Sequence, residues 1–278
     1  APRPLREMGR KKIAQISLPV YVWAMFHYEV SGVKVPFDQD QNTALQKAIS
    51  NRGLNNVASW EINRRSLDSR KTASIQYVYT LTVACTKEAK RTGKGVSRIH
   101  PEKSTEPVLN RPSADFGQVL VIGAGPAGLF AALQLAELGL KPLIIERGSR
   151  VDERRQEVAQ FWQHGKLDPD SNMQFGEGGA GTFSDGKLTS RTQSIVMKKI
   201  LSDLVTAGAQ EEIMYDHRPH IGTDVLVKVV ASLRRRIEQL GGQFRFNTRL
   251  EDWEQTTDGR ISRIKLVNCR SEHGGNHE

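Results

Sequence analysis

The 278-residue sequence is poor in cysteine and contains no long hydrophobic run. Its two cysteines, Cys85 and Cys269, lie far apart, so there is no CxxC pair, no zinc pattern and no disulfide framework. This excludes a CxxC-type dithiol reductase and is typical of a reducing compartment. The longest apolar runs, such as Val20–Phe26, fall well short of the ~20 residues that cross a bilayer, so we predict no membrane span.

Motifs of several enzyme classes are also missing. The sequence has no Gly-x-Ser-x-Gly elbow, no HExxH and no P-loop lysine, so hydrolase and kinase functions lack their residues. His217 and His220 have HxxH spacing, but Pro219 stands between them, and we predict a loop without a metal. His220 is instead a candidate for facing a substrate.

Charge is distributed unevenly along the chain. The first 107 residues contain 18 Lys and Arg against 9 Asp and Glu, whereas the remainder contains 22 of each, so the net charge of +9 belongs to the first third. A basic surface can attract nucleic acid, an acidic protein or an anionic membrane. No nucleic-acid motif accompanies the charge, so we interpret it as a solvated surface with a basic tail and expect no nucleic-acid partner. We predict a cytoplasmic protein, or an organellar one if the tail is what remains of a transit peptide.

Periodicity divides the chain into four segments. We predict a basic tail at 1–12, a small α+β domain at 13–90, a linker at 91–116 and a nucleotide-binding domain at 117–278. The second segment has a helical pattern at Thr43–Ser50 and strand patterns at Ala14–Leu18, Ala58–Ser66 and Ser74–Cys85. The segment after Cys85 loses periodicity and carries Pro101, Pro107 and Pro112.

A dinucleotide-binding signature begins at residue 119. An apolar strand pattern, Val119–Ile122, leads into Gly123-Ala-Gly125-Pro-Ala-Gly128, and helical spacing follows in Leu129, Ala132, Leu133 and Ala136. A second apolar run, Leu143–Ile145, ends at Glu146, 23 residues after the first glycine. This is the order and spacing of a strand, a glycine-rich turn, a helix and a ribose-binding acid.

Each part of the signature has a physical task. Gly123 permits the tight turn, Gly125 lets a pyrophosphate approach the backbone, and Gly128 lets the helix lie close to the strands. Free N–H groups and the dipole at the helix start attract the anion. Glu146 can accept hydrogen bonds from both ribose hydroxyls and would repel the 2′-phosphate of NADP. The spacing alone leaves FAD and NAD open.

Longer stretches resemble a known family. VIGAGPAGLFAALQLAELGLKPLIIERG resembles the opening of the glutathione-reductase-type FAD-binding fold. Three further segments resemble uncharacterised FAD-dependent dehydrogenases, a family of NAD(P)/FAD-dependent oxidoreductases with a ferredoxin-like domain ahead of the flavin domain: NRRSLDSRK (Asn63–Lys71), FGEGGAGTFSDGKLTSR (Phe175–Arg191) and RPHIGTDVL (Arg218–Leu226). The resemblance covers most of residues 56–270 but not Tyr21–Asp40.

The resemblance implies an α/β fold: a Rossmann-like FAD/NAD(P)-binding domain preceded by a small α+β ferredoxin-like domain. It implies FAD as cofactor, with NAD(P)H a candidate electron donor. Such flavoproteins continue with a return to the nucleotide sheet and a Gly-Asp motif, which this sequence lacks. We therefore expect the nucleotide-binding domain to be incomplete, truncated at its C-terminal end.

A second glycine-rich stretch, Gly176–Gly186, places five glycines within 11 residues. The resemblance implies that it lines the isoalloxazine and the ribityl-pyrophosphate; the alternative is a flexible surface loop. It also implies that Lys187 lies near the flavin N1–C2 edge and that the backbone of Leu250 contacts adenine. The predicted cofactor-binding residues are Gly123, Ala124, Gly125, Pro126, Ala127, Gly128, Glu146, Arg147, Gly178, Gly179, Ala180, Gly181, Thr182, Ser184, Lys187 and Leu250.

The remaining patterns predict scaffold. Helices are expected at Asp152–His164, Ser194–Thr206 and Asp224–Leu240, a strand at Gln243–Phe246, and a hairpin formed by Arg249–Trp253 and Ile261–Val267. Val225, Val229, Leu233 and Ile237 form an apolar stripe on the third of these helices. We interpret the neighbouring Arg234, Arg235 and Arg236 as a solvated face.

Together these features favour the N-terminal portion of an FAD-dependent, dehydrogenase-like oxidoreductase. Two alternatives remain: an NAD-binding dehydrogenase or sensor, and a non-enzymatic binding module that uses the basic N-terminal domain. The sequence indicates a small-molecule substrate without identifying it, and it assigns neither the catalytic residues nor the oligomeric state.

Overall fold

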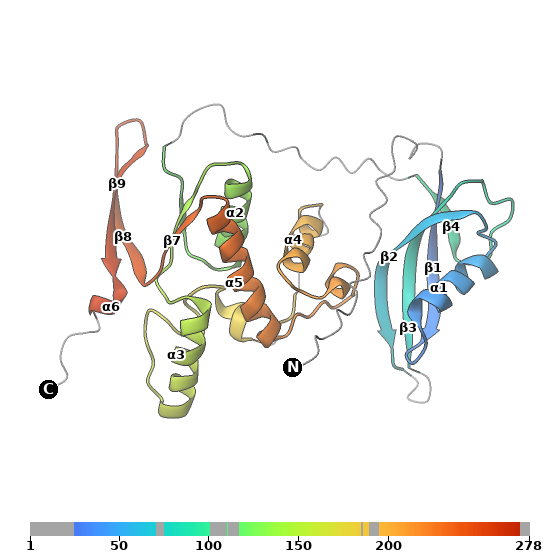
Figure 1. Cartoon of the computed structure of the whole chain (residues 1–278), viewed down its shortest axis with the longest axis horizontal. Coiled ribbons are helices and arrows are strands. Elements are labelled where there is room, and N and C mark those ends of the chain that lie inside the picture. Colours follow the sequence, from blue (N-terminus) through green and yellow to red (C-terminus); the bar gives the residue numbers. More distant parts are fainter. Residues whose placement is uncertain are drawn as a thin grey trace, which may run out of the picture. The chain divides into compact units, whose positions relative to one another are not determined.

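A computed structural model describes residues 25–70, 75–100, 110, 117–184, 186–188 and 195–272 (Figure 1). The chain divides into two compact units, Ala1–Pro101 and Glu102–Glu278. Each unit is considered by itself. The predicted strand at Ala14–Leu18 and the basic tail lie outside the described residues.

The first unit is a four-stranded antiparallel sheet with one helix. Its strands stand in the order β2-β3-β1-β4, and every neighbouring pair is antiparallel. The elements along the chain are β1 (Phe26–Pro36), α1 (Gln41–Asn51), β2 (Val57–Asp68), β3 (Gln76–Cys85) and β4 (Val96–Ile99). The predicted helix and the predicted strands at 58–66 and 74–85 are confirmed.

Helix α1 and the sheet enclose the core of this unit. The Asp40 side chain accepts a hydrogen bond from the Thr43 amide at 2.9 Å, which caps the start of the helix. Leu45 and Ile49 of α1 are buried with Tyr79 and Leu81 of β3. In β3 the alternate residues Tyr79, Leu81, Val83 and Cys85 are buried, and Ile75, just before the strand, is exposed. Period-two alternation therefore identified the inner face.

Two strands of this sheet differ from the sequence prediction. β1 was missed because a bulge lies between Val30 and Val33, where Gly32 has φ +66°. Tyr28 and Val30 are buried before the bulge and Val33 and Val35 after it, so the alternation changes phase mid-strand. β4 lies inside the range predicted as linker, so the sheet extends past the predicted boundary at residue 90.

The second unit is built on a three-stranded parallel sheet in the order β5-β6-β7. β5 pairs with β6 in the register Leu120 to Leu143, and β6 pairs with β7 in the register Leu143 to Gln243. β8 and β9 form a separate antiparallel pair. The elements are β5 (Leu120–Ile122), α2 (Pro126–Glu137), β6 (Leu143–Ile145), α3 (Val151–His164), η2 (Ala180–Phe183), α4 (Ile195–Thr206), η3 (Glu211–Met214), α5 (Thr223–Gln239), β7 (Gln243–Arg245), β8 (Thr248–Gln255), β9 (Ile261–Asn268) and α6 (Cys269–Glu272).

Apolar stripes of α2 and α5 form much of the second core. Leu129 and Leu133 of α2 are buried in the same cluster as Val229, Leu233 and Ile237 of α5. α2 and α5 contact each other, as Figure 1 shows. The predicted helices, the short parallel strands and the hairpin are therefore confirmed, and their apolar faces meet as periodicity indicates.

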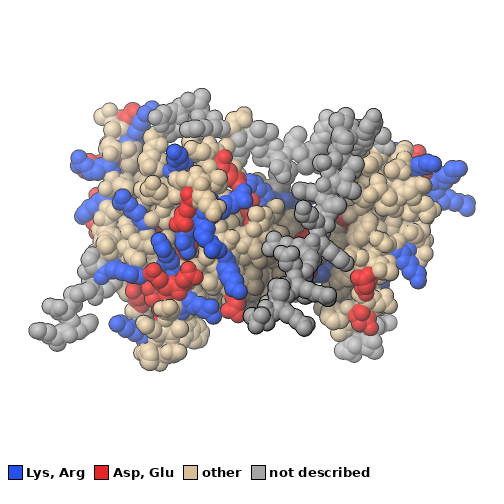
Figure 2. Space-filling view, in the orientation of Figure 1, with Lys and Arg blue, Asp and Glu red and all other residues tan. Residues whose placement is uncertain are grey.

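The surface of the second unit carries both signs of charge. Lys, Arg, Asp and Glu side chains intermingle over it in Figure 2. Exposed pairs such as Arg263 with Glu254, 3.1 Å apart, contribute to this pattern. Across the described residues, no helix is both long enough and apolar enough to cross a membrane.

Candidate functional site

The turn between β5 and α2, hereafter the first glycine loop (Gly123–Gly128), uses its three glycines differently. Gly123 has φ +93°, and a Cβ added to Gly128 would lie 1.9 Å from the Gly123 carbonyl oxygen. The turn itself therefore requires both residues. Gly125 has φ −69°, and no atom lies within 4 Å of an added Cβ. Neither the backbone conformation nor the packing of the turn requires a glycine at 125.

Helix α2 presents its N-terminus beside Gly125. Pro126 occupies the first turn, and the first hydrogen bond across the cap runs from the Leu129 amide to the Gly125 carbonyl oxygen at 2.9 Å. First-turn amides have no intrahelical acceptor, and no acidic side chain lies in this turn. The positive end of the helix is therefore able to attract an anion.

Glu146 follows β6 and joins three segments through backbone amides. Its Oε2 accepts from the Ala124 amide at 2.6 Å, and its Oε1 accepts from the amides of Gly148 at 2.9 Å and Gly176 at 3.1 Å. The side chain is buried, with only 5% of the residue exposed. Each carboxylate oxygen has two lone pairs, and amides occupy three of the four, so Oε2 retains one position for a further donor such as a ribose hydroxyl.

A cavity of about 290 Å³ lies over the first glycine loop and Glu146. It brings together six predicted residues from four stretches of chain: Gly123, Gly125, Glu146, Arg147, Gly179 and Leu250. The cavity has the position expected for the adenosine half of a dinucleotide, because the loop and the acid meet in it.

Three neighbours of this cavity were not predicted. The Arg147 guanidinium lies 4.4 Å from the ring centroid of Phe175. The Asp170 carboxylate lies 3.4 Å from Arg249 Nη1 and 4.0 Å from Arg147 Nη1. Phe175 directly precedes the second glycine stretch, which was a usable signal, whereas Asp170 and Arg249 are joined only by the fold.

The second glycine loop (Gly176–Gly186) rests on buried charges. Arg154 of α3 is fully buried, and its guanidinium donates to the carbonyl oxygens of Asn172, Glu177 and Gly179 at 2.7–2.9 Å. Glu177 is also fully buried: its Oε1 accepts from Arg234 Nε and its Oε2 from the Val151 amide, each at 2.8 Å. Five donors in a rigid fork allow one arginine to hold several carbonyls of the loop.

Burial perturbs both charges in this network. Loss of solvent raises the pKa of Glu177, opposed by the Val151 amide and by Arg234. Burial lowers the pKa of Arg154 to about 10, which leaves it cationic at neutral pH. The network therefore places a cation beneath the second glycine loop.

These contacts show a loop held in place by the core. Most of its glycines are needed by the backbone or by close packing. Gly176 has φ +117°, and an added Cβ would lie 2.5 Å from Arg154 Cδ. Gly178 has φ +84°, and an added Cβ would lie 2.2 Å from Thr182 Oγ1. Gly181 is the exception, with open space around an added Cβ and no left-handed φ.

Two interpretations of individual side chains are corrected. Thr182 was expected to offer its hydroxyl to a ligand, but it is fully buried, and its Oγ1 finds no partner among the described residues. Arg234 was expected on a solvated face, but only 8% of it is exposed because it lies four residues after buried Val230 on the same helix face. Arg235 and Arg236 are exposed as predicted.

The two glycine loops contact each other. The Gly178 amide donates to the Ala124 carbonyl oxygen at 2.8 Å, and the Gly176 amide donates to Glu146. A larger cavity of about 770 Å³ borders the other side of this junction and is lined there by Pro126, Ala127, Gly178 and Gly181, with Lys187 among the remaining lining residues. Ala180, Thr182 and Ser184 line neither cavity; the Ser184 hydroxyl donates to the Gly181 carbonyl oxygen at 3.0 Å.

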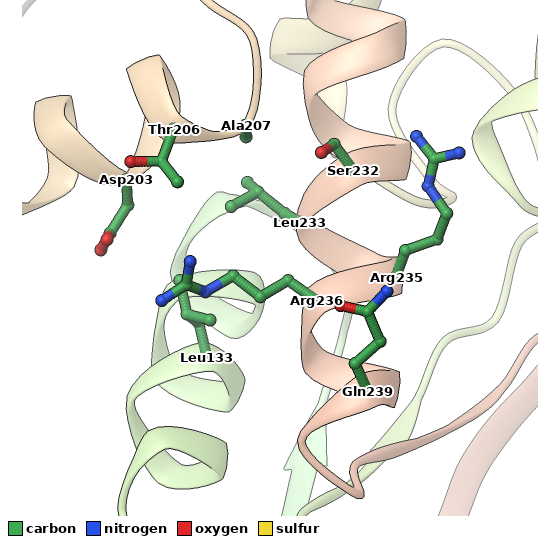
Figure 3. Close-up of a pocket in the computed structure, with 9 residues that line it drawn as sticks. All are labelled: Leu133, Asp203, Thr206, Ala207, Ser232, Leu233, Arg235, Arg236 and Gln239. Carbon is green, nitrogen blue, oxygen red and sulfur yellow. The ribbon is translucent and has the colours of Figure 1, made fainter.

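A third cavity of about 370 Å³ lies between α2, α4 and α5 (Figure 3). Its charged residues include Asp203 and Arg236, and Arg236 pairs with Glu137 at 2.9 Å. None of the predicted cofactor-binding residues lines it. We assign it no part in cofactor binding.

With this geometry in place, the sequence match is decisive. Residues 117–158, which carry the first glycine loop, α2 and Glu146, match the model of an FAD-binding domain. The cofactor is FAD. The match and the parallel sheet together indicate a mixed α/β fold of the FAD/NAD(P)-binding type.

One curated relative matches most of the chain. An uncharacterized protein of Clostridium beijerinckii is 40% identical over 255 residues, which is 87% of this chain and 47% of that protein. The chain thus spans about half the length of this curated relative.

Solved structures resemble the chain only distantly. THI4 of Thermovibrio ammonificans has a TM-score of 0.35 and 17% identity, covering 56% of this chain and 49% of THI4. L-Amino acid deaminase of Proteus myxofaciens has a TM-score of 0.26 and 15% identity, covering 58% of this chain and 45% of the deaminase. Both TM-scores are low, and we draw nothing from these two structures.

Proposed function

We propose that this chain is part of an FAD-dependent, dehydrogenase-like oxidoreductase that holds FAD across the junction of its two glycine loops. The observation that supports this most directly is Gly125, whose missing Cβ would otherwise project into open space beside a helix N-terminus and a buried acid. A packed turn requires no glycine there, whereas a closely approaching pyrophosphate does.

The adenosine half would occupy the cavity of about 290 Å³. Glu146 would accept from the ribose hydroxyls, while the first-turn amides of α2 would bind the pyrophosphate. Arg147 and the backbone of Leu250 line the same cavity and would contact the adenosine.

The flavin half would extend past Pro126 toward the cavity of about 770 Å³. When bound, FAD supplies the hydride and electron chemistry, and the protein supplies position and electrostatics. Gly178 and Gly181 would let the backbone approach the ring, and Lys187 on the cavity rim would place positive charge near it. The fixed second glycine loop suits this role because its shape is set before the cofactor arrives.

We further propose that the first unit is a ferredoxin-like variant. Its β-α-β-β order and its antiparallel pairing favour a split βαβ arrangement. The turns at 86–95 stand where that pattern would carry a second helix. This unit offers no observation that favours nucleic-acid binding over a solvated basic surface.

The purified full chain, incubated with FAD and freed of excess cofactor, should carry a flavin absorbance spectrum. Gly125→Ala should weaken FAD binding at least about tenfold, or ~1.4 kcal/mol, because the methyl group occupies the space for the pyrophosphate. The helix cap would lose at most about 1 kcal/mol of stability, so the variant should remain folded. Equal FAD affinity in wild type and variant would contradict the proposed site.

Competition between FAD and NAD in thermal unfolding distinguishes the FAD-binding proposal from the NAD-binding alternative. The thermal midpoint of the full chain should rise with FAD concentration, because a ligand that binds the native state stabilises it. Excess NAD should leave that rise unchanged. A rise with NAD and none with FAD would replace our proposal by a dehydrogenase or sensor that binds NAD.

A further inference from the structure

We propose that the cavity of about 770 Å³ binds a small apolar molecule with one anionic group, and that Arg218 binds that group. This inference rests on the proposed function in one respect: a molecule bound there beside FAD would be the substrate. It names a substrate class, which the fold and the cofactor leave open.

The cavity walls are apolar on three sides. Helices α2, α4 and α5 supply Leu129, Phe130, Met197, Ile200, Leu201, Leu204, Leu226, Val230 and Leu233. Apolar surface removed from water contributes roughly 25 cal/mol per Å², so such walls favour an apolar occupant over a polar one. A mostly apolar pocket with a few polar groups at one edge is the usual form of a small-molecule site.

The charged residues of the cavity have one sign. Lys187 and Arg218 line it together with His217, and none of the described lining residues is Asp or Glu. An ion that enters these walls loses hydration, and only a group of opposite sign recovers that loss. The lining therefore favours an anion and disfavours a cation.

Backbone hydrogen bonds fix this basic edge. The Leu188 amide donates to the Pro219 carbonyl oxygen at 2.9 Å, and the Ile221 amide donates to the Gly186 carbonyl oxygen at 3.0 Å. Lys187 and His220 pair in a short antiparallel bridge. Two segments about thirty residues apart in sequence thus present their cations at one edge of the cavity.

The anion bound here would differ from the FAD pyrophosphate. That group is proposed to lie at the N-terminus of α2, where Gly125 borders the smaller cavity and Pro126 borders the larger one at the loop junction. Lys187 and His217 have other interactions, whereas no acidic side chain of the described residues pairs with Arg218. An arginine in this position can bind a carboxylate through two parallel hydrogen bonds.

Octanoate and 1-octanol test the inference, because they share a chain and differ in charge. The full chain would be labelled with ¹³C-methyl methionine, and the Met197 resonance on the cavity wall would report binding without any need for FAD. Octanoate should shift this resonance saturably and bind at least about tenfold more tightly than 1-octanol. The exposed Met214, which does not line the cavity, serves as the reference signal.

Two variants test the two parts of the recognition separately: the contact of the anionic group with Arg218 and the fit of the apolar chain in the cavity. Arg218→Gln should weaken octanoate about tenfold and leave 1-octanol unchanged, since only the anion contacts the guanidinium. Leu201→Trp should weaken both, because it fills the cavity. Arg235→Gln is the matched control: it removes an exposed arginine of α5 that lines a different cavity, and it should change neither affinity.

Equal affinity for octanoate and 1-octanol, or an unchanged octanoate affinity in Arg218→Gln, would overturn the inference, as would the absence of a Met197 shift. FAD absorbance is measured separately on the same samples. Selective octanoate binding without bound flavin would support this pocket and contradict the proposed cofactor site. Bound flavin without selective octanoate binding would support the proposed cofactor site and contradict this pocket.

Discussion

The two glycine loops look alike in sequence and serve different physical purposes. In the first glycine loop, a turn needs Gly123 and Gly128, while Gly125 borders open space. In the second glycine loop, Gly176 and Gly178 have left-handed φ values and lie against buried side chains. Closely spaced glycines therefore indicate, in the first place, positions where the backbone conformation or the packing needs a glycine. A glycine indicates a ligand only where neither reason applies and an added Cβ would contact no other atom.

The loops also differ in what supports them. The start of a helix and one buried carboxylate, that of Glu146, support the first, whereas a network of the buried charges Arg154, Glu177 and Arg234 supports the second. Paired charges without solvent are costly to separate, so this network fixes one arrangement of the loop. Substitutions at the two loops should consequently affect stability and cofactor affinity in different proportions.

The largest expected effect is on stability, from Glu177→Gln. The change removes the buried carboxylate that pairs with Arg234 at 2.8 Å and leaves this cation only the exposed Asp152 carboxylate, 3.6 Å away. Breaking such a pair costs about 3–5 kcal/mol, and urea unfolding of the full chain would measure it. An effect below about 1 kcal/mol would mean that the charges do not support the second loop.

Gly128→Ala should come next. Its Cβ would clash with the Gly123 carbonyl oxygen, and overfilling of this kind typically costs about 1–3 kcal/mol. Gly125→Ala is the matched comparison within the same loop and should be clearly milder in urea unfolding. Equal losses in the two variants would refute the division of roles among these glycines.

A smaller effect is expected from Gly181→Ala in the second loop. Open space surrounds the added Cβ, so unfolding free energy should change by less than about 1 kcal/mol. Affinity for FAD should fall a few-fold, roughly 0.5–1 kcal/mol, because the methyl group faces the larger cavity. FAD titration followed by flavin fluorescence would check this, and a large loss of stability would contradict the expected open space.

The smallest effect should come from an exposed ion pair of the same unit. Glu254 and Arg263 are 61% and 75% exposed, in contrast to the buried Glu177. Glu254→Gln should alter unfolding free energy by less than about 1 kcal/mol, since water screens both charges. This variant shows how much of the Glu177 effect depends on burial rather than on charge alone.

Sequence reasoning was most successful where contacts are local. The first glycine loop, α2 and Glu146 lie within 24 consecutive residues, and Gly123, Gly125 and Glu146 line one cavity. Helix α5 and its apolar stripe followed from spacing in the same way. β1 was missed because the bulge at Gly32 breaks the alternation on which strand prediction depends.

Sequence reasoning was least successful at the buried ions. Arg234 was expected in solvent and is buried, although its spacing from Val230 was a signal that could have been used. Arg154 and Glu177 gave no such indication, because their burial depends on partners 18 or more residues away. Thr182 is a related case: its place in a glycine-rich loop suggested an accessible hydroxyl, and packing of the loop buried it.

The amino-acid sequence by itself determined the order of strand, turn, helix and acid. This order depends on residue spacing and on the backbone conformations that glycine allows within one segment. Only the tertiary structure decided which glycines border open space, which charges are buried, and that Lys187 and Arg218 line one largely apolar cavity. The physical reason is that burial and empty space arise from segments distant in sequence, which meet when the chain folds.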